Sequence, residues 1–177
     1  PQVGRHNSST ALAAAAAAWV LGVDGAAVAE GLNSFTGAGR RMEYKGTCNG
    51  AAVYDDYAHH PGELHALLSS IREKAPGKRV IAAFQPHTYS RTRALFDDFV
   101  RELQLADQVL VTEIYAAREK NTLGISAAAL AERIEGARFC PTLDDLAAQL
   151  KAIATPDDVI LTTGAGSISR VSDMILD

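Results

Sequence analysis

Beyond residue 40 the chain alternates between two patterns of apolar residues. Short runs that are apolar on both faces, such as residues 79–84, are typical of strands buried inside a parallel sheet. Between these runs, apolar residues recur at the spacing of an amphipathic helix, as Leu64, Leu67 and Ile71 do. The predicted strands are residues 42–47, 51–56, 79–84, 108–114, 137–140 and 158–163, and the predicted helices are residues 62–74, 92–105, 126–134, 143–153 and 167–176.

Asn49 and Gly50 join the first two predicted strands and favour a tight antiparallel hairpin. Helices separate the strands that follow, so these strands are expected to run parallel. The pattern therefore predicts an open, mostly parallel α/β sheet that begins with one antiparallel hairpin. Ligands of such sheets bind beyond the carboxyl ends of the strands. The loops that this rule selects are residues 55–61, 85–91, 113–120 and 164–167.

Before this sheet the sequence predicts two short helices. Residues 11–21 are rich in alanine, the best helix former, and the polar residues 7–10 offer capping oxygens in front of them. Asp24 can cap a second helix over residues 25–32. These helices have no sheet of their own.

A domain boundary is predicted between residues 36 and 37, within a linker over residues 33–39. Residues 1–36 would then be a remnant of one domain, and residues 37–177 a complete α/β domain. Because the chain begins with Pro1 and enters a helix almost at once, we expect it to be part of a longer protein.

Composition and charge exclude several classes of protein. Hydrophobic residues make up 47% of the chain and charged residues 21%, which excludes a largely disordered protein. A net charge of −4 argues against a nucleic-acid-binding surface. Cys48 and Cys140 are too few and too far apart for a disulfide scaffold, which favours a reducing compartment. The apolar stretch at residues 11–23 is too short to span a bilayer, and we expect a cytoplasmic protein.

The densest chemistry lies in the string Asp-Asp-Tyr-Ala-His-His-Pro at residues 55–61, where a strand gives way to a helix. Because alternate side chains of a strand share a face, either Asp55, Tyr57 and His59 or Asp56, Ala58 and His60 can lie together while the strand lasts. A carboxylate, an aromatic ring and an imidazole favour a polar binding site, although a hydrophilic turn with a helix cap would use the same residues. Neighbouring histidines such as His59 and His60 rarely converge on one ion, so no metal site is assigned.

A second string, Gln-Pro-His-Thr-Tyr-Ser-Arg-Thr at residues 85–92, follows the most apolar strand. Pro86 interrupts the strand and Thr92 can cap the next helix. Arg91 would then lie near a helix N-terminus, where a guanidinium and backbone N–H groups favour a carboxylate or a phosphate. The alternative is a capped helix start with a solvated arginine.

Three weaker signals remain. Arg40 and Arg41 follow a glycine-containing linker and could reach a phosphate bound by another domain, or could be solvated charges. The Gly-Ala-Gly-Ser turn at residues 164–167 suits phosphate binding and a tight strand-to-helix turn about equally. His6 and Asn7 precede the alanine-rich helix. Since the chain holds no G-x-x-x-x-G-K-[ST] loop, a nucleotide triphosphate would need a cradle from elsewhere.

Taken together, these strings resemble the Mur ligases. The resemblance rests on Gly-Arg-His-Asn at residues 4–7, Phe-Thr-Gly at residues 35–37 with Arg40 and Arg41, the strings at residues 55–61 and 85–92, and Glu-Ile-Tyr-Ala-Ala-Arg-Glu at residues 113–119. It covers residues 4–167, nearly the whole chain.

The resemblance implies a three-domain ligase whose C-terminal domain has a Rossmann-like fold. The N-terminal domain would bind a UDP-sugar, and the central domain would carry the phosphate loop and the Mg²⁺ ligands. Residues 1–36 would be the last helices of the central domain and residues 37–177 the C-terminal domain.

Within the family, the strings at residues 55–61 and 85–92 are similar to those of the member that joins L-alanine to the carboxylate of UDP-N-acetylmuramate. That reaction uses ATP, passes through an acyl phosphate and belongs to peptidoglycan synthesis, on which cell shape and division depend. The present segment is expected to be inactive alone. The alternatives are another amino-acid ligase or a tripeptide-recycling ligase of the family, and a non-catalytic Rossmann-like binding module.

The resemblance also implies roles for single residues at the nucleotide. Asn7 would lie beside the adenine, Arg41 would reach the ATP phosphates, and Asp56 would accept hydrogen bonds from the ribose hydroxyls. Thr10 stands where the family has a second asparagine.

At the amino acid, Tyr57, His59 and Arg91 would surround L-alanine, with Arg91 on its carboxylate. Ser167 stands where an aspartate commonly follows Gly-Ala-Gly, and no role is assigned to it.

Overall fold

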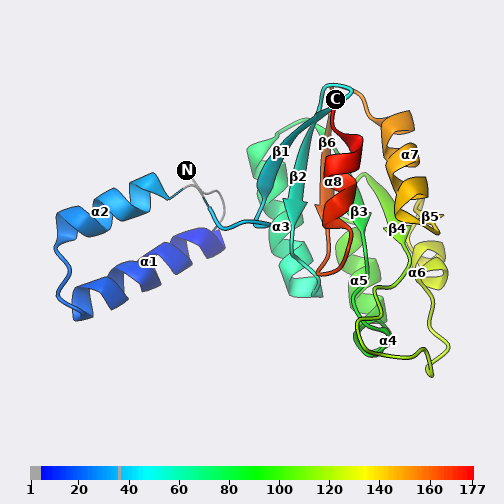
Figure 1. Cartoon of the computed structure of the whole chain (residues 1–177), viewed down its shortest axis with the longest axis horizontal. Coiled ribbons are helices and arrows are strands. Elements are labelled where there is room, and N and C mark those ends of the chain that lie inside the picture. The colour runs from blue at the N-terminus through cyan, green and yellow to red at the C-terminus, as the bar shows by residue number, and fades with distance from the viewer. Residues whose placement is uncertain (1–4, 36) are drawn as a thin grey trace. The chain divides into compact units, whose positions relative to one another are not determined.

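The computed structural model describes residues 5–35 and 37–177, with side chains from residue 8 onward. The chain divides into two compact units, Pro1–Gly39 and Arg40–Asp177 (Figure 1). The sequence placed this division between residues 36 and 37. That the first unit is the end of another domain stays a prediction.

The first unit consists of α1 (Arg5–Val20) and α2 (Gly25–Ser34). Asp24 caps α2 as predicted, since its carboxylate accepts the N–H of Ala26 at 2.9 Å. The capping role predicted for residues 7–10 is wrong, because α1 begins at Arg5 and includes them. A helix that has nucleated gains one hydrogen bond for each added residue, so the alanine-rich run extends across these polar positions.

The first unit has no buried core among its described side chains. Trp19 is 75% exposed, and Leu12, Val20 and Leu21 are also largely exposed. All the buried residues that form the core therefore belong to the second unit.

The second unit is a six-stranded sheet in the order β1-β2-β6-β3-β4-β5. β1 pairs antiparallel with β2, and every other pair is parallel. The elements are β1 (Glu43–Cys48), β2 (Ala51–Asp56), α3 (Pro61–Lys74), β3 (Arg79–Phe84), α4 (Tyr89–Ala94), α5 (Phe96–Leu103), β4 (Gln108–Thr112), α6 (Ala127–Arg133), β5 (Arg138–Cys140), α7 (Leu143–Ile153), β6 (Asp158–Thr163) and α8 (Ser169–Ile175). The predicted fold class is confirmed. Asn49 and Gly50 turn the hairpin with φ of +50° and +81°, as two-residue hairpin turns require.

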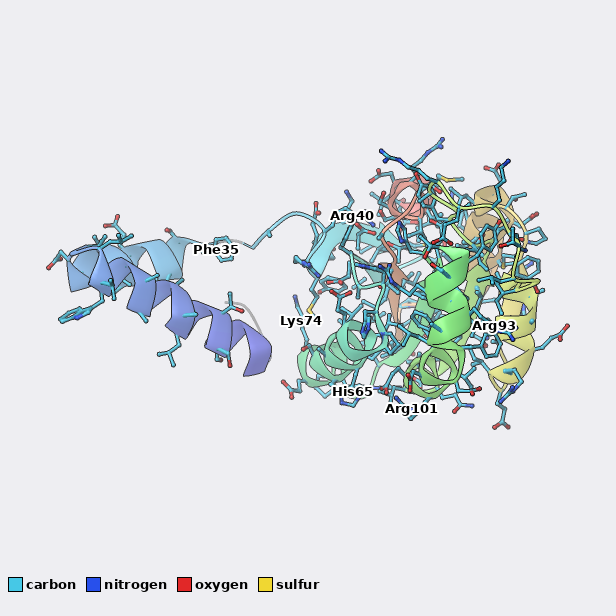
Figure 2. The ribbon with its side chains drawn as sticks, turned by 90° about the horizontal axis from the view of Figure 1, so that it is seen from below. Phe35, Arg40, His65, Lys74, Arg93 and Arg101 are labelled. Carbon is cyan, nitrogen blue, oxygen red and sulfur yellow. The ribbon has the colours of Figure 1, made fainter. Side chains whose placement is uncertain are left out.

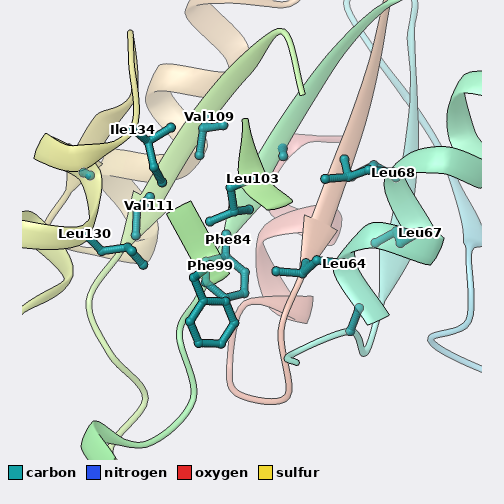
Figure 3. Close-up of a cluster of buried hydrophobic side chains, with 14 of the residues drawn as sticks. Leu64, Leu67, Leu68, Phe84, Phe99, Leu103, Val109, Val111, Leu130 and Ile134 are labelled. Atoms are coloured by element: carbon teal, nitrogen blue, oxygen red, sulfur yellow. The ribbon is translucent and has the colours of Figure 1, made fainter. Parts of the chain in front are cut away.

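Helices cover both faces of the sheet (Figure 1). Along β3, Val80, Ala82 and Phe84 face the cluster under α3, α5 and α6, whereas Ile81 and Ala83 face the cluster under α7 and α8. Figure 3 shows the first of these clusters. Burial on both faces explains why the strand reads as a continuous apolar run.

The helix predicted over residues 92–105 is two helices, α4 and α5, which meet at Leu95. Leu95 has φ −115° and ψ 23°, so the chain changes direction there. The change in direction accompanies the packing of Phe99 against Phe84, with ring centroids 5.4 Å apart. The cap also differs from the prediction, because Thr88 caps α4 and Thr92 is buried.

The carboxyl ends of four strands lie level with one another. Asp56 of β2 and Phe84 of β3 both pair with Thr163 of β6, and Phe84 also pairs with Val111 of β4. The loops that follow these strands therefore leave the sheet at one edge, as the sequence predicted.

Asp158 lies at the amino end of β6, at the opposite end of the strands, and its contacts allow a test of the stability of the fold. Its carboxylate, in a residue 2% exposed, accepts hydrogen bonds from Nε and Nη2 of Arg79 at 2.7 and 2.8 Å and from the N–H of Thr155 at 2.8 Å. Burial raises the pKa of Asp158, but the hydrogen bonds and the charge of Arg79 outweigh burial and bring the pKa below its ordinary 3.8.

We predict that Asp158→Asn lowers the free energy of unfolding by about 2 kcal/mol at neutral pH. A carboxylate with a lower pKa in the folded state stabilises the fold above its unfolded pKa, and this contribution disappears as pH falls through the folded pKa. The difference from wild type should thus shrink as the pH falls toward about 3, as measured by urea denaturation. Asp157→Asn, at a side chain 94% exposed, is the control and should change little. A deficit independent of pH would contradict the assignment.

Candidate functional site

Backbone pairing between two loops builds the floor of the candidate site. Beyond the ends of β3 and β4, His87 and Tyr115 form a parallel bridge. The N–H of Tyr115 donates to the carbonyl of Pro86 at 2.9 Å, and the N–H of Thr88 donates to the carbonyl of Tyr115 at 2.9 Å. The two loops are therefore fixed to each other, although neither is part of a strand.

Four rings form a continuous row across three loops. The ring centroids of Tyr57 and His59 lie 5.2 Å apart, those of His59 and His87 5.7 Å, and those of His87 and Tyr115 5.7 Å, the last pair stacked. Arg91 joins the row through Nη1, 3.1 Å from Nδ1 of His87.

The three residues predicted to surround the amino acid, Tyr57, His59 and Arg91, thus lie on one row of contacts. His87 connects them, although the sequence alone assigns no role to His87 or to Tyr115. Both belong to strings that the sequence singled out, but only the pairing of their loops shows that they are neighbours.

Glu63 holds the loop that carries His59. Its carboxylate accepts the backbone N–H groups of His59 and His60 at 3.0 and 3.2 Å and lies 3.3 Å from Nδ1 of His59. Burial raises the pKa of Glu63. These N–H groups, together with positive charge on His59 and Arg41, lower the pKa by more than burial raises it, so the net shift is downward. Glu63 is therefore ionised at neutral pH and fixes the start of α3.

Arg91 is a half-buried cation without a carboxylate partner among the described residues. Burial lowers the pKa of its neighbour His87, and the charges of Arg91 and His59 lower it further, against a smaller opposing effect of Glu119. His87 is therefore neutral at physiological pH, and the charge of Arg91 is left for an anion from outside the chain.

Thr88, between His87 and α4, has φ +64°, which is rare for a β-branched residue. Its backbone is fixed on both sides, since its N–H donates to Tyr115 and its carbonyl accepts the hydroxyl of Thr92 at 2.7 Å. Strained backbone of this kind concentrates at functional sites, where the surrounding contacts hold it. Here it forms the turn between His87 and α4, the helix that carries Arg91.

Asp56 is only 7% exposed and is engaged by its own surroundings. One carboxylate oxygen accepts the N–H of Met42 and the other the N–H of Ala58, each at 2.7 Å. Burial raises the pKa of Asp56, although these N–H groups and the charge of Arg41 oppose the rise. Asp56 thus ties the segment just before β1 to the loop after β2, and its role toward a ribose stays a prediction.

Arg40 and Arg41 have different surroundings although they are neighbours. Arg40, labelled in Figure 2, donates Nε to buried Asp55 at 2.8 Å and Nη2 to the carbonyl of Gly164 at 2.6 Å, and its guanidinium lies 5.0 Å from the ring centroid of Tyr57. Arg41 is exposed, lies 5.8 Å from the same ring, and forms no ion pair with a described residue. Arg40 is thus a structural cation, whereas the charge of Arg41 is not taken up by a carboxylate of the described residues.

Steric demand explains the glycines of the turn after β6. Gly164 has φ +149°, and a Cβ there would lie 2.7 Å from the carbonyl oxygen of Gln85. A Cβ on Gly166 would lie 2.5 Å from Oε1 of Gln85 and 2.6 Å from Cγ of Tyr115. The structure therefore favours the tight turn over a phosphate loop. Ser167 is in reach of the Gln85 amide, at 3.4 Å from its nitrogen.

Other predicted features fall outside this row. Asn7 lies in α1, but its side chain is outside the described part of the chain. No three histidine, cysteine or carboxylate side chains of the described residues are grouped so that they could hold a metal ion. Within the same ranges, none of the helices combines the length and apolar character needed to cross a membrane.

Comparison with known proteins gives consistent matches. The family profile described as "Mur ligase, glutamate ligase domain" matches residues 40–166. The chain is 42% identical over 177 residues to the UDP-N-acetylmuramate–L-alanine ligase of Agathobacter rectalis, covering 98% of this chain and 38% of that protein. It is 45% identical over 175 residues to the ligase of the same name from Agrobacterium fabrum, covering 96% of this chain and 37% of that protein. The chain thus spans less than two fifths of the length of these relatives.

Solved structures agree with these matches. The UDP-N-acetylmuramate-alanine ligase of Thermotoga maritima superposes with a TM-score of 0.80 at 32% identity, covering 97% of this chain and 37% of that one. A murein peptide ligase from Psychrobacter arcticus gives a TM-score of 0.72 at 25% identity, covering 99% and 37%.

We predict that Gly166→Ala lowers the free energy of unfolding by about 1–3 kcal/mol, because its Cβ would displace Tyr115 or Gln85. Thermal and urea unfolding measure the loss. Gly62→Ala is the matched control, since a Cβ there meets only Nδ1 of His60, at 3.8 Å, and Gly62 lies in a helix. Equal stabilities of Gly166→Ala and wild type would show that the close packing is absent.

Proposed function

This chain belongs to the Mur ligase family, and from that premise we propose that it is the C-terminal part of an ATP-dependent ligase that joins L-alanine to the carboxylate of UDP-N-acetylmuramate. The observation that carries the proposal is the row of Tyr57, His59 and His87 that ends at Arg91, a cation that pairs with no carboxylate of the described residues. The proposed setting is peptidoglycan synthesis in the cytoplasm.

The amino acid would bind along this row. Arg91 offers a planar guanidinium to the α-carboxylate, which it can bind through two parallel hydrogen bonds. The ring of Tyr57 adds an aromatic wall beside His59, and the guanidinium groups of Arg40 and Arg41 already lie 5.0 and 5.8 Å from its centroid. A free α-amino acid carries its carboxylate and its ammonium group on one carbon atom, so a cation followed by a row of polar rings suits it better than a simple anion.

The nucleotide would meet the linker side of the same edge. Arg41 is exposed and free of carboxylates among the described residues, as a contact to the phosphates of ATP requires. Asp56 would accept ribose hydroxyls and Asn7 would lie at the adenine, as the family resemblance implies. We assign Mg²⁺ to the rest of the ligase, as the family resemblance implies.

The proposed reaction has two steps. A carboxylate oxygen of UDP-N-acetylmuramate takes the γ-phosphoryl group of ATP, and ADP leaves. The amine of L-alanine then attacks the acyl carbon, forming the C–N bond, and the C–O bond to phosphate breaks. Arg91 contributes by holding the amine at a fixed distance from the acyl carbon, which converts a chance encounter into an oriented one.

A second candidate is a ligase that recycles a tripeptide onto the same sugar nucleotide, and the likeness to a murein peptide ligase favours testing it. The two candidates differ in the nucleophile alone. Steady-state rates of the full-length enzyme with L-alanine and with the tripeptide separate them, and a preference for the tripeptide would overturn the proposal for L-alanine.

We predict that the 177-residue chain alone has no ligase activity, because it holds no phosphate loop. Phosphate release in the presence of ATP, Mg²⁺, UDP-N-acetylmuramate and L-alanine measures this. Steady turnover by the chain alone would refute the prediction.

We predict that Arg91→Ala in the full-length enzyme raises KM for L-alanine by about 100-fold, as expected for the loss of a charge-assisted pair, with little change in KM for ATP. The control is Arg93→Ala, which removes the same charge from an exposed position of α4 (Figure 2). Unchanged use of L-alanine by the Arg91 variant would remove Arg91 from the site.

A further inference from the structure

The two histidines at the centre of the row are held as opposite tautomers, and this difference divides their chemistry. We propose that His59 accepts the proton that the α-ammonium group of the incoming amino acid must lose, whereas His87 is fixed as a hydrogen-bond donor. The inference rests on the proposed ligase function and deepens it, since it names the proton acceptor of the amide-forming step.

The partners of His59 fix its proton on Nδ1. This nitrogen lies 2.9 Å from the carbonyl oxygen of Tyr57 and 3.3 Å from a carboxylate oxygen of Glu63. Both partners can only accept a hydrogen bond, because Glu63 is ionised and a carbonyl has no proton. Nδ1 of His59 therefore carries the hydrogen, and in the neutral ring Nε2 carries the lone pair.

The partner of His87 fixes the opposite arrangement. Its Nδ1 lies 3.1 Å from Nη1 of Arg91. A guanidinium can only donate, so Nδ1 of His87 must accept and cannot carry a proton. The neutral ring then has its hydrogen on Nε2. The same contact opposes protonation of His87, in agreement with the lowered pKa of this residue.

Two adjacent rings thus present different atoms to a ligand. No described residue forms a hydrogen bond with Nε2 of His59 or with Nε2 of His87. His59 offers a lone pair, and His87 offers an N–H beside the cation of Arg91. The carboxylate of an amino acid matches the N–H of His87 and the cation of Arg91. Its ammonium group matches the lone pair of His59.

The proton transfer precedes the attack of the amine on the acyl carbon. An N–H bond of the α-ammonium group breaks, its proton bonds to Nε2 of His59, and the amine keeps the electron pair that attacks the acyl carbon. The attack places a positive charge on the nitrogen. Its extra proton leaves with the departing phosphate, and His59 returns its own proton to water.

The groups that face His59 suit this role. Glu63, from α3, places a negative charge 3.3 Å from Nδ1. Tyr57 meets the ring edge to face, and His87, from the loop after β3, is neutral. The cation of Arg91 bonds to His87, which lies between Arg91 and His59.

The first experiment measures the tautomers in the 177-residue chain by long-range ¹H–¹⁵N NMR of the imidazole nitrogens above neutral pH. His59 is expected to carry its hydrogen on Nδ1 and His87 on Nε2. His59→Gln and His87→Gln assign the signals. A hydrogen on Nε2 of His59 would overturn the inference without touching the ligase assignment, because this measurement needs no activity.

The second experiment uses His59→Asn in the full-length enzyme. An asparagine amide can still donate to the carbonyl of Tyr57 but has no base at the Nε2 position. We expect kcat with L-alanine to fall about 100-fold or more, the usual contribution of a general base. The deficit relative to wild type should be smaller with L-3-fluoroalanine, whose ammonium group gives up its proton more readily. Arg91→Ala is the matched comparison and should show equal deficits with both amino acids, since it acts on the carboxylate.

Hydroxylamine, used as the nucleophile in place of L-alanine, separates the inference about His59 from the proposed ligase function. It is unprotonated at neutral pH and therefore needs no base. Formation of a hydroxamate from ATP and UDP-N-acetylmuramate by the wild-type enzyme tests the proposed function, and its absence would count against that function. If His59→Asn loses hydroxylamine and L-alanine turnover equally, or shows the same deficit with both amino acids, then His59 does not accept the proton. Retained hydroxamate formation with lost L-alanine turnover supports the inference.

Discussion

The candidate site depends on the backbone pairing of His87 with Tyr115. This parallel bridge continues the pairing of β3 with β4 past the ends of both strands. Because the sheet fixes the two loops in register, the ring of Tyr115 stacks on His87, and His87 in turn lies 5.7 Å from His59. Without the bridge, His87 would be one more polar side chain on a loop, and Arg91 would have no fixed neighbour. The buried sheet thus fixes the positions of side chains that lie beyond the ends of its strands.

Much of the fold could be predicted because both faces of the sheet are buried. Continuous apolar runs separated by amphipathic helices identify the strands, and Asn49 with Gly50 identifies the hairpin. The break at Leu95 could not be predicted, because the packing of Phe99 on Phe84 accompanies it and joins residues from different elements. For the site, the sequence supplied the loops and the residues Tyr57, His59 and Arg91. It could not supply the link through His87, since that link depends on a partner in another loop.

The distribution of charge shows why two neighbouring arginines differ. Asp55 is buried and needs a partner, and Arg40 supplies it while also binding the carbonyl of Gly164. Both contacts fix Arg40 against the sheet and remove it from use by a ligand. Arg41 receives no carboxylate from the described residues and rests near the ring of Tyr57. A sequence with two adjacent arginines cannot reveal which of them the buried carboxylate takes, because the choice depends on φ values of +56° at Arg40 and +47° at Met42, which only the folded linker defines.

The neutral state of His87 is what makes the row usable for a zwitterion. A protonated His87 would put a second cation against Arg91 and would remove the lone pair that accepts its hydrogen bond. Burial and the charge of Arg91 both lower the pKa of His87, so His87 is neutral beside the charged Arg91. Its contact with Arg91 then fixes one tautomer. The cation beside His87 is then Arg91, while His59, whose Nδ1 is held by Tyr57 and Glu63, keeps the lone pair of its neutral ring on Nε2. In the proposed function, a molecule that carries a carboxylate and an ammonium group on one carbon atom would find a partner for each group in Arg91 and His59, whereas a simple carboxylate or a simple amine would find only one.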